Sequence, residues 1–284
     1  MILQHSKSEQ FCYSINMPNV LKAGGSIEPF NEDKLRLSIE RAAIPKELVE
    51  NIVIHVKSKL YDGIHTSEIY KHVAEFLENS SHPFSRAKYS LKQAIMDLGP
   101  TGYPFEDYIS EILKMEGYET KLRQILTGKC ISHEIDLIVT KNNISSMVEC
   151  KFHNSPGTHS QVHVSLYTKA RFDDIKEKHN LADAWLVTNT KITQDGLNYA
   201  ICSNMKVISW DYPENGSFRD LIEKYKLHPI TVLTSLSQNQ KQLLTANHVV
   251  LAKDVCKNPS SLDILGLPED KKNSILSECQ FVYG

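Results

Sequence analysis

Three residues near the middle of the chain have the types and spacing needed to hydrolyse a phosphate ester. Asp136 ends the run HEID, and twelve residues separate it from Glu149, which is followed two positions later by Lys151. Because side chains alternate along a strand, Glu149 and Lys151 share one face, as do Glu134 and Asp136. A hairpin through the polar turn at 141–143 therefore places Asp136 beside Glu149, with Lys151 one step along.

This pair of acids suits a hard cation. Two neighbouring carboxylates repel each other unless a cation lies between them, and oxygen ligands favour Mg²⁺ or Mn²⁺. We expect Asp136 and Glu149 to hold such a metal, which would polarise a phosphoryl oxygen and acidify a bound water. The ammonium of Lys151 would orient that water or offset charge on the phosphate. Taken alone, these residues also fit an ordinary Glu/Lys pair on a solvent-facing hairpin.

The elements that must position these residues form an α/β unit over residues 99–226. Pro104 suits the first turn of a helix, and Gly117 suits its end. We expect further elements as two strands within 129–152, a helix over 161–178, a strand over 184–187, a helix over 193–204 and a strand over 207–210. This order predicts a mixed sheet flanked by helices.

The residues of this unit also resemble a known family. Glu149-Cys150-Lys151, the run 133–136 and the upstream pair Phe105-Glu106 are similar to the PD-(D/E)xK nucleases, specifically the Mrr-like restriction endonuclease branch, over about 103–210. The resemblance implies a restriction-endonuclease-like fold and Mg²⁺-dependent hydrolysis of phosphodiester bonds. Matched residue by residue, it implies Asp136, Glu149 and Lys151 as the catalytic set, Glu106 as an extra acid from the first helix, and Gln161 as a supporting polar group.

The N-terminal unit, residues 1–98, reads as a small β-hairpin followed by helices. We expect strands at 20–22 and 27–30, a helix capped by Asn31, a helix after Pro45, a helix capped by Thr66, and a last helix over 85–98. The apolar residues of the second helix recur every four positions, which predicts one buried face.

The same unit resembles an ATP-cone, a regulatory nucleotide-binding module. The matching residues are Val20-x-Lys22-x-x-Gly25, Glu28-Pro29-Phe30 and Lys34-Leu35. The resemblance implies that ATP or dATP binds as an effector at Val20, Lys22 and Lys34, with the two lysines on the phosphates. The family favours Arg after the first lysine, whereas this chain has Ala23, so we expect weak binding. The alternative is a cone kept only for contacts with proteins.

The C-terminal unit, residues 227–284, is expected to be wholly helical. We expect helices over 237–246 and 269–279, with a short one starting at 260. Leu265-Gly266-Leu267 faintly resembles a helix–hairpin–helix turn, so this unit is expected to make either partner contacts or nonspecific DNA contacts. A zinc site is not expected, because no second ligand pair accompanies His159 and His163.

Composition limits the remaining choices. The 284 residues carry 32 Lys and Arg against 34 Asp and Glu, a net charge of −2, so binding to nucleic acid by bulk charge is excluded. No apolar run approaches the roughly 18 residues of a membrane span, and the first dozen residues do not read as a signal peptide. Six scattered cysteines without a CxxC pair favour reduced thiols, so we expect a cytoplasmic protein without membrane contact.

Together these patterns predict a Mg²⁺-dependent DNA endonuclease with a nucleotide-sensing cone, assembled as a homo-oligomer, in restriction, phage defence or DNA repair. Two alternatives stay open. One is a non-catalytic regulator that binds DNA in response to a nucleotide. The other is a nuclease that cuts RNA, because a metal site of this kind attacks phosphate and not a base.

Overall fold

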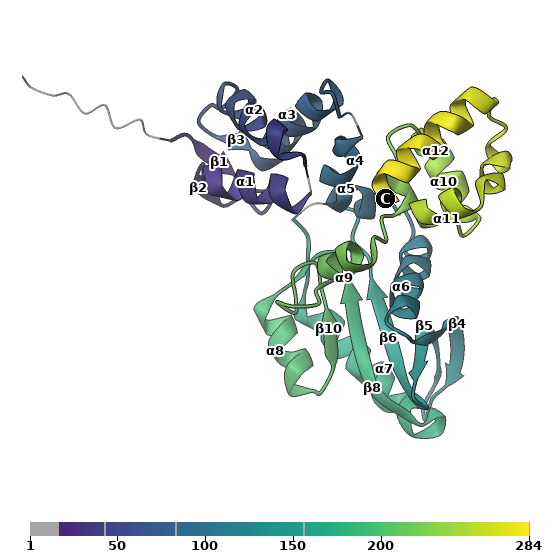
Figure 1. Cartoon of the computed structure of the whole chain (residues 1–284). Helices are drawn as coiled ribbons and strands as arrows, with labels where there is room; N and C mark the ends of the chain where they lie inside the picture. Colours follow the sequence, from purple (N-terminus) through teal and green to yellow (C-terminus); the bar gives the residue numbers. More distant parts are fainter. Residues whose placement is uncertain (1–16, 43, 83, 156, 284) are drawn as a thin grey trace, which may run out of the picture.

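The computed structural model describes residues 17–42, 44–82, 84–155 and 157–283, so residues 1–12, where no signal peptide is expected, lie outside it. Three units are visible in Figure 1. A central sheet with its helices occupies the lower half, and two mainly helical units, one from each end of the chain, lie side by side above it. Within the described residues, no helix is long and apolar enough to cross a membrane.

Before residue 85, the described part of the N-terminal unit contains three short strands and three helices. Their bounds are β1 (Asn19–Leu21), β2 (Ile27–Pro29), α1 (Glu32–Arg41), α2 (Lys46–Lys57), β3 (Ile64–His65) and α3 (Thr66–Glu78). The strand order is β2-β1-β3, with β3 parallel to β1, a third strand that the sequence did not predict. Asn31 caps α1 as predicted, since its side chain accepts a hydrogen bond from the backbone N–H of Lys34 at 3.0 Å.

Two expectations for this unit were wrong. Thr66 is the first residue of α3 rather than its cap, and its hydroxyl bonds the carbonyl oxygen of Leu21 at 3.3 Å. The single helix expected over 85–98 is divided at Ser90 into α4 (Ser85–Tyr89) and α5 (Leu91–Met96).

The division at Ser90 has a packing reason, because the segment contributes to all three hydrophobic cores. Tyr89 packs against the core of the cone-like unit. Ala87 and Ala94 are buried in the core of the C-terminal unit, while Leu91 and Ile95 belong to the core of the sheet unit. The segment therefore connects the three units physically as well as along the chain.

The central unit is built on a five-stranded mixed sheet of order β10-β8-β6-β5-β4. Its elements are α6 (Tyr103–Met115), β4 (Glu119–Thr127), β5 (Ser132–Lys141), β6 (Ile144–Lys151), β7 (His159–Ser160), α7 (Val162–His179), β8 (Leu181–Thr188), β9 (Lys191–Ile192), α8 (Gln194–Cys202), β10 (Lys206–Ile208) and α9 (Phe218–Tyr225). β4, β5 and β6 are antiparallel, whereas β6, β8 and β10 are parallel. The predicted mixed sheet is confirmed, but β4 and α9 were not predicted.

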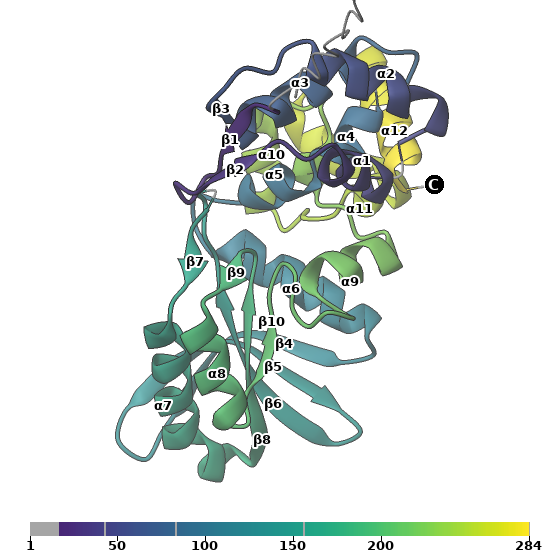
Figure 2. The same cartoon turned by 90° about the vertical axis from the view of Figure 1, so that its left-hand side faces the viewer.

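Helices cover both faces of this sheet. α6 and α9 pack on one face, around Leu137, Val148 and Phe218. α7 and α8 pack on the other, around Met147 and Ile175 (Figure 2). The β5–β6 hairpin turns at Asn142 and Asn143, both with positive φ, a geometry that asparagine tolerates in two-residue hairpin loops. Both long strands of the hairpin are thus held at a fixed register.

The C-terminal unit is helical, as expected. Its elements are η1 (Ile230–Val232), α10 (Gln238–Ala246), α11 (Ala252–Lys257), η2 (Pro259–Leu265) and α12 (Glu269–Tyr283). A disulfide joins Cys256 of α11 to Cys279 of α12, with Cα atoms 6.1 Å apart. The expectation that the cysteines are all reduced thiols was therefore wrong, because the packing of α11 against α12 brings together two cysteines that are 23 residues apart.

Candidate active site

Asp136 and Glu149 meet where the β5–β6 ladder ends. The last paired residues are Leu137 and Val148, so Asp136 and Glu149 are the next residues on the two strands. Asp136 Oδ2 accepts a hydrogen bond from the backbone N–H of Cys150 at 2.7 Å. The carboxylate thus replaces the ladder bond that a regular strand would make, which fixes its position beside Glu149.

The two acids are partly buried side by side, and their ionisation reflects it. Burial, followed by repulsion from Asp136, raises the pKa of Glu149 to about 7. Burial is also the main reason that the pKa of Asp136 is raised. Because a buried carboxylate near another resists carrying its charge, the pair would be stabilised by a bound cation.

Glu106 adds a third acid from α6. Its carboxylate accepts a hydrogen bond from Arg123 Nη1 at 3.0 Å. Burial, followed by repulsion from Asp136, raises the pKa of Glu106 to about 7 despite this arginine. Asp136 on β5 therefore acts electrostatically on Glu106 of α6 and Glu149 of β6 across one end of the sheet.

Lys151 and Gln161 lie at the same end of the sheet. Lys151 is the last residue of β6 and is paired with Thr188 of β8, and its charge lowers the pKa of Glu149. Thr188 Oγ1 accepts a hydrogen bond from Ser160 Oγ at 3.1 Å. Gln161, the exposed N-cap residue of α7, follows Ser160 directly and therefore lies near the same end of β6 and β8. The catalytic role of each residue stays a prediction.

Arg171 is a site residue that the sequence reasoning missed. It lies on α7 with only 10% of its side chain exposed, and it donates hydrogen bonds to the Glu149 carboxylate and to the carbonyl oxygen of Glu134. One signal was available: in the predicted helix, Arg171 falls on the apolar stripe between Thr168 and Ile175, where a cation requires a buried partner.

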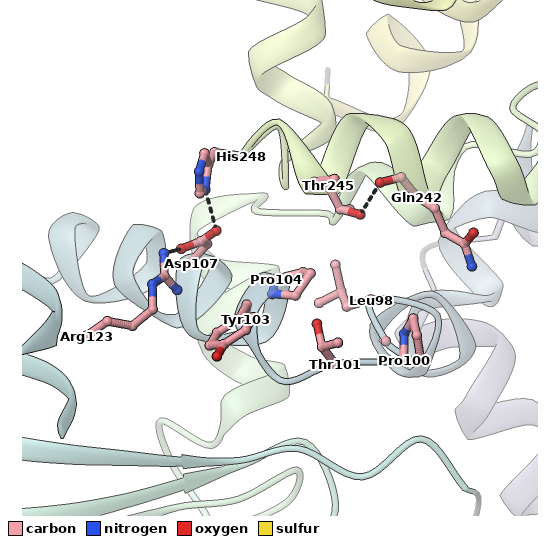
Figure 3. Close-up of a pocket in the computed structure, with 12 residues that line it drawn as sticks. Leu98, Pro100, Thr101, Tyr103, Pro104, Asp107, Arg123, Gln242, Thr245 and His248 are labelled. Carbon is pink, nitrogen blue, oxygen red and sulfur yellow. Dashed lines mark hydrogen bonds and ion pairs between the residues drawn. The ribbon is translucent and has the colours of Figure 1, made fainter. Parts of the chain in front are cut away.

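Arg123 is a second missed residue. It lies across from Asp136 on β4, between the pairs Leu122–Leu137 and Gln124–Ile135, with a positive φ of 50°. Its second guanidinium nitrogen donates to Asp107 Oδ1 at 2.7 Å, and Asp107 Oδ2 lies 2.8 Å from His248 Nδ1 (Figure 3).

A cavity of about 480 Å³ adjoins this ion-pair chain, between the start of α6 and the end of α10. Through Arg123 and Asp107, the C-terminal unit is therefore connected to the Glu106 carboxylate.

The donor set fits a hard divalent cation better than zinc. Asp136 and Glu149 offer carboxylate oxygens, and burial is the main reason that their pKa values are raised. Across the described part of the chain, no three His, Cys, Asp or Glu side chains are already grouped to hold a metal ion. The histidines nearby have other partners: His133 Nε2 lies 2.9 Å from Asp174, and His153 Nε2 lies 3.0 Å from Ser160 Oγ.

The predicted nucleotide residues of the N-terminal unit line a separate cavity of about 260 Å³, which also has Val20 in its wall. Lys22 Nζ and Lys34 Nζ lie 2.9 and 2.8 Å from the same oxygen of Glu28. Hydrogen bonds from Lys34 and then Lys22 hold the pKa of Glu28 at about 2. Two cations therefore share one carboxylate at this exposed site, which leaves an excess of positive charge.

Comparisons with known proteins agree with this division into units. Family models match at residues 18–95 (ATP cone domain), 100–214 (restriction endonuclease) and 228–282 (AF1548-like, C-terminal). An uncharacterized protein of Archaeoglobus fulgidus is 34% identical over 176 residues, which are 62% of this chain and all of the relative. The chain belongs to the AF1548-like family.

A solved structure agrees with that assignment. The crystal structure of the protein of unknown function AF1548 has a TM-score of 0.58 and 32% identity, over 65% of this chain and 99% of that one. The resemblance to an Mrr-like restriction endonuclease fused to an ATP-cone is confirmed.

The C-terminal unit is matched by the AF1548-like model. Gly266, at the centre of the expected helix–hairpin–helix turn, adopts a positive φ of 60° and ends the short helix η2 before α12 begins. The geometry of this turn does not by itself indicate binding to phosphate. Both expectations for the unit, contacts with a partner and contacts with DNA, therefore stay predictions.

Proposed function

We propose that this AF1548-like protein is a metal-dependent nuclease that hydrolyses phosphodiester bonds in DNA, and that an adenine nucleotide bound to the cone regulates it. The restriction endonuclease and ATP-cone units support the general class. The observation that carries the proposal is the cluster of Glu106, Asp136 and Glu149 beside Lys151, where burial and the charge of Asp136 raise the pKa values of both glutamates. Restriction, phage defence or DNA repair would be the setting, with assembly of several copies part of the proposal.

In this mechanism Asp136 and Glu149 would hold Mg²⁺ or Mn²⁺. The metal would supply a polarised phosphoryl oxygen and a more acidic water. Lys151, one step beyond Glu149 on the same face of β6, would orient the attacking water and stabilise the charge that builds on the phosphate. Glu106 would hold or accept a proton near that water, since its pKa of about 7 suits transfer near neutral pH. Gln161 would position the scissile phosphate.

Arg171 favours a second candidate function. Its guanidinium already neutralises Glu149, one of the two proposed metal ligands, and such a pair would also suit a protein that binds DNA without cutting it. In the catalytic proposal, Arg171 instead favours the ionised form of Glu149 and fixes the orientation of its carboxylate for metal binding. Activity measurements separate these two functions directly.

Regulation by the cone is supported by one contact between units. A Cβ at Gly157 would lie 2.9 Å from the Cβ of Ala23, so the two backbones touch. Ala23 follows the proposed phosphate-binding Lys22, and Gly157 lies in the loop that follows catalytic strand β6. A nucleotide that moves the hairpin at Lys22 would therefore move this loop.

The decisive experiment incubates the full-length protein with supercoiled plasmid, in Mg²⁺, Mn²⁺ or EDTA, with and without ATP. We expect nicked or linear DNA only with a metal, and a changed rate with ATP. Asp136→Asn keeps an oxygen that can accept the Cys150 N–H but removes the charge, so we expect cleavage to fall by about a hundredfold or more.

The matched control is Glu119→Gln at the opposite, exposed end of the β4–β5 ladder, which should cut at the native rate. Equal cleavage by folded Asp136→Asn and wild type would show that the site is wrong. Metal-independent DNA binding without cleavage would favour the regulator, and cleavage of RNA alone would change the substrate. An unchanged rate with ATP, and with Lys22→Gln, would remove the regulatory part.

A further inference from the structure

A third cavity lies where the three units of the chain meet, next to the cone cavity and separate from the candidate active site. Its volume is about 350 Å³, and its walls come from α1, the α4–α5 segment, α9 and the start of the C-terminal unit. In Figures 1 and 2, α5 and α9 lie next to one another at this junction. Every unit therefore contributes side chains to a single hollow.

The charge of this cavity is unusual for the molecule. Of the described residues that line it, five are Lys or Arg and one is a carboxylic acid, Glu223; the basic residues are Arg41, Lys88, Lys92, Arg219 and Lys226. Two of the other cavities have balanced linings, and the cone cavity has two lysines and one carboxylate. The one beside Asp107 has one arginine and one carboxylate, and the one beside Glu116 has two lysines and two carboxylates.

The acids near Arg219 and Lys92 are held at a distance or by other cations. Arg219 makes two long ion pairs of 3.8 Å each, with Glu223 and Asp220, both beyond hydrogen-bond distance. Asp211, close enough to influence Lys92, is held by Lys191 at 2.6 Å. Arg219 Nε and His228 Nδ1 are buried and have no hydrogen-bond partner among the described residues. Both residues line the cavity, so its wall contains two buried nitrogens to which a ligand could hydrogen-bond.

Crowding among the cations is visible in their ionisation. Burial, followed by the charge of Lys226, lowers the pKa of Lys88. Burial also lowers the pKa of Lys92, with Arg219 contributing, and it lowers that of His228 to about 4. Holding these charges together therefore costs free energy in the absence of an anion, which several linked negative charges would offset.

We propose that this cavity binds a small molecule carrying two or three linked phosphates, and that its binding holds the three units together. Phosphate oxygens accept hydrogen bonds from several Lys and Arg side chains at once, which a single carboxylate does not. The remaining wall is mixed in polarity and includes Trp210, whose ring centroid lies 5.3 Å from Lys92 Nζ. A DNA duplex, whose major groove alone is about 12 Å wide, is too broad to enter.

This cavity is distinct from the nucleotide cavity of the cone, although the two adjoin. Ser38 and Tyr89 line both, and their hydroxyl oxygens lie 3.4 Å apart in the shared wall. The proposed ligand is thus independent of the nucleotide proposed for Lys22 and Lys34, and the experiment must keep the two apart.

The test is calorimetric titration of the full-length protein with inorganic tripolyphosphate and, separately, ATP, in metal-free buffer. It uses a background in which Lys22→Gln and Lys34→Gln have weakened the cone site. We expect tripolyphosphate to bind in this background, and Lys92→Gln and Arg219→Gln each to weaken it by about tenfold or more. The tripolyphosphate affinity of Lys92→Arg should stay within about threefold of the background protein. Replacing the exposed Lys271 of α12, in Lys271→Gln, should leave this affinity unchanged.

Hydrogen exchange gives a second readout, because a ligand held by three units should protect residues 88–92 and 219–228 together. ATP binding without tripolyphosphate binding would mean that the base rather than the phosphates is recognised, which contradicts the proposal. No binding of either compound at millimolar concentration, or equal binding by Lys92→Gln and Lys271→Gln, would overturn it. Displacement of tripolyphosphate by a short DNA duplex would assign the cavity to nucleic acid instead.

Discussion

In the nuclease unit the functional charges are buried beside like charges, whereas in the cone they are exposed and paired with an opposite charge. Glu149 has a pKa raised to about 7 by burial and by Asp136. Glu28 has a pKa lowered to about 2 by hydrogen bonds from two lysines. At the first site Arg171 and Arg123 pair with Glu149 and Glu106, yet burial and the charge of Asp136 keep both pKa values raised. At the second site two lysines share one carboxylate.

This difference decides how each site should respond to ligands and substitutions. At the nuclease site a metal would relieve repulsion that folding has created, so small chemical changes should have large effects. At the cone a nucleotide must displace Glu28 from Lys22 and Lys34, and exposed ion pairs contribute little. Substitutions there should act weakly, and on binding rather than on stability.

The largest change in stability, and so the strongest test of this comparison, is expected from Arg171→Met. The change leaves Glu149 without its buried cation, so the free energy of unfolding should fall by about 3 kcal/mol. The loss of stability should be larger at pH 8 than at pH 6, because at the lower pH Glu149 is mostly protonated and no longer carries an unpaired charge. Denaturant unfolding at the two pH values measures this.

Lys169→Met on the same helix is the matched control, because Lys169 pairs with the partly exposed Asp173. Its effect should stay within about 0.5 kcal/mol. If Arg171→Met were no more destabilising than this control, the guanidinium would not be holding a buried charge, and the contrast between the two regions would fail.

The second effect is a dependence of stability on pH that metal should suppress. For Glu106 and Glu149 the folded pKa of about 7 lies above the ordinary value of 4.5, so the folded state binds more protons between these values. Stability should therefore fall as pH rises from about 4.5 to 7 in EDTA. Mg²⁺ binds the deprotonated form, so its stabilisation should grow over the same range.

Thermal unfolding between pH 5 and 8.5, with Mg²⁺ or EDTA, measures this linkage. Glu28 does not interfere, because its lowered pKa gives stability that is complete above 4.5 and is lost only as pH falls toward 2. Asp136→Asn should weaken both the pH dependence and the effect of Mg²⁺. An equal Mg²⁺ effect at pH 5.5 and 8, or in this variant, would place the metal elsewhere.

Much of the nuclease site could be predicted because three of its residues lie on one hairpin, close together in sequence. Strand alternation and a two-residue turn are enough to bring Asp136, Glu149 and Lys151 together. Glu106 came from the family resemblance, because no local pattern connects α6 to β5. Arg171 could not be assigned a partner, since an ion pair across 22 residues depends on how α7 packs on the sheet.

The fold elements that were missed have similar causes. β4 contains Arg123 at a positive φ, and this irregularity shifts the phase between Leu122 and Ile125, so the strand shows no alternation. β3 is only two residues long. The division of the 85–98 helix at Ser90 follows from packing against three cores, which a single amphipathic pattern cannot reveal.

The smallest effect, and the one that sharpens the comparison most, is expected from Glu28→Gln. Removing this carboxylate frees Lys22 and Lys34 from their shared partner, so the affinity for ATP should rise by about two- to fivefold, while Lys22→Gln should lower it. Calorimetry on the full-length protein measures both. Glu32→Gln is the matched control, because Glu32 also pairs with two cations, Arg36 and Lys57, but does not line the cavity. Weaker ATP binding by Glu28→Gln would mean that Glu28 contacts the nucleotide itself, so that the cone site is built for its ligand in the same direct way as the nuclease site.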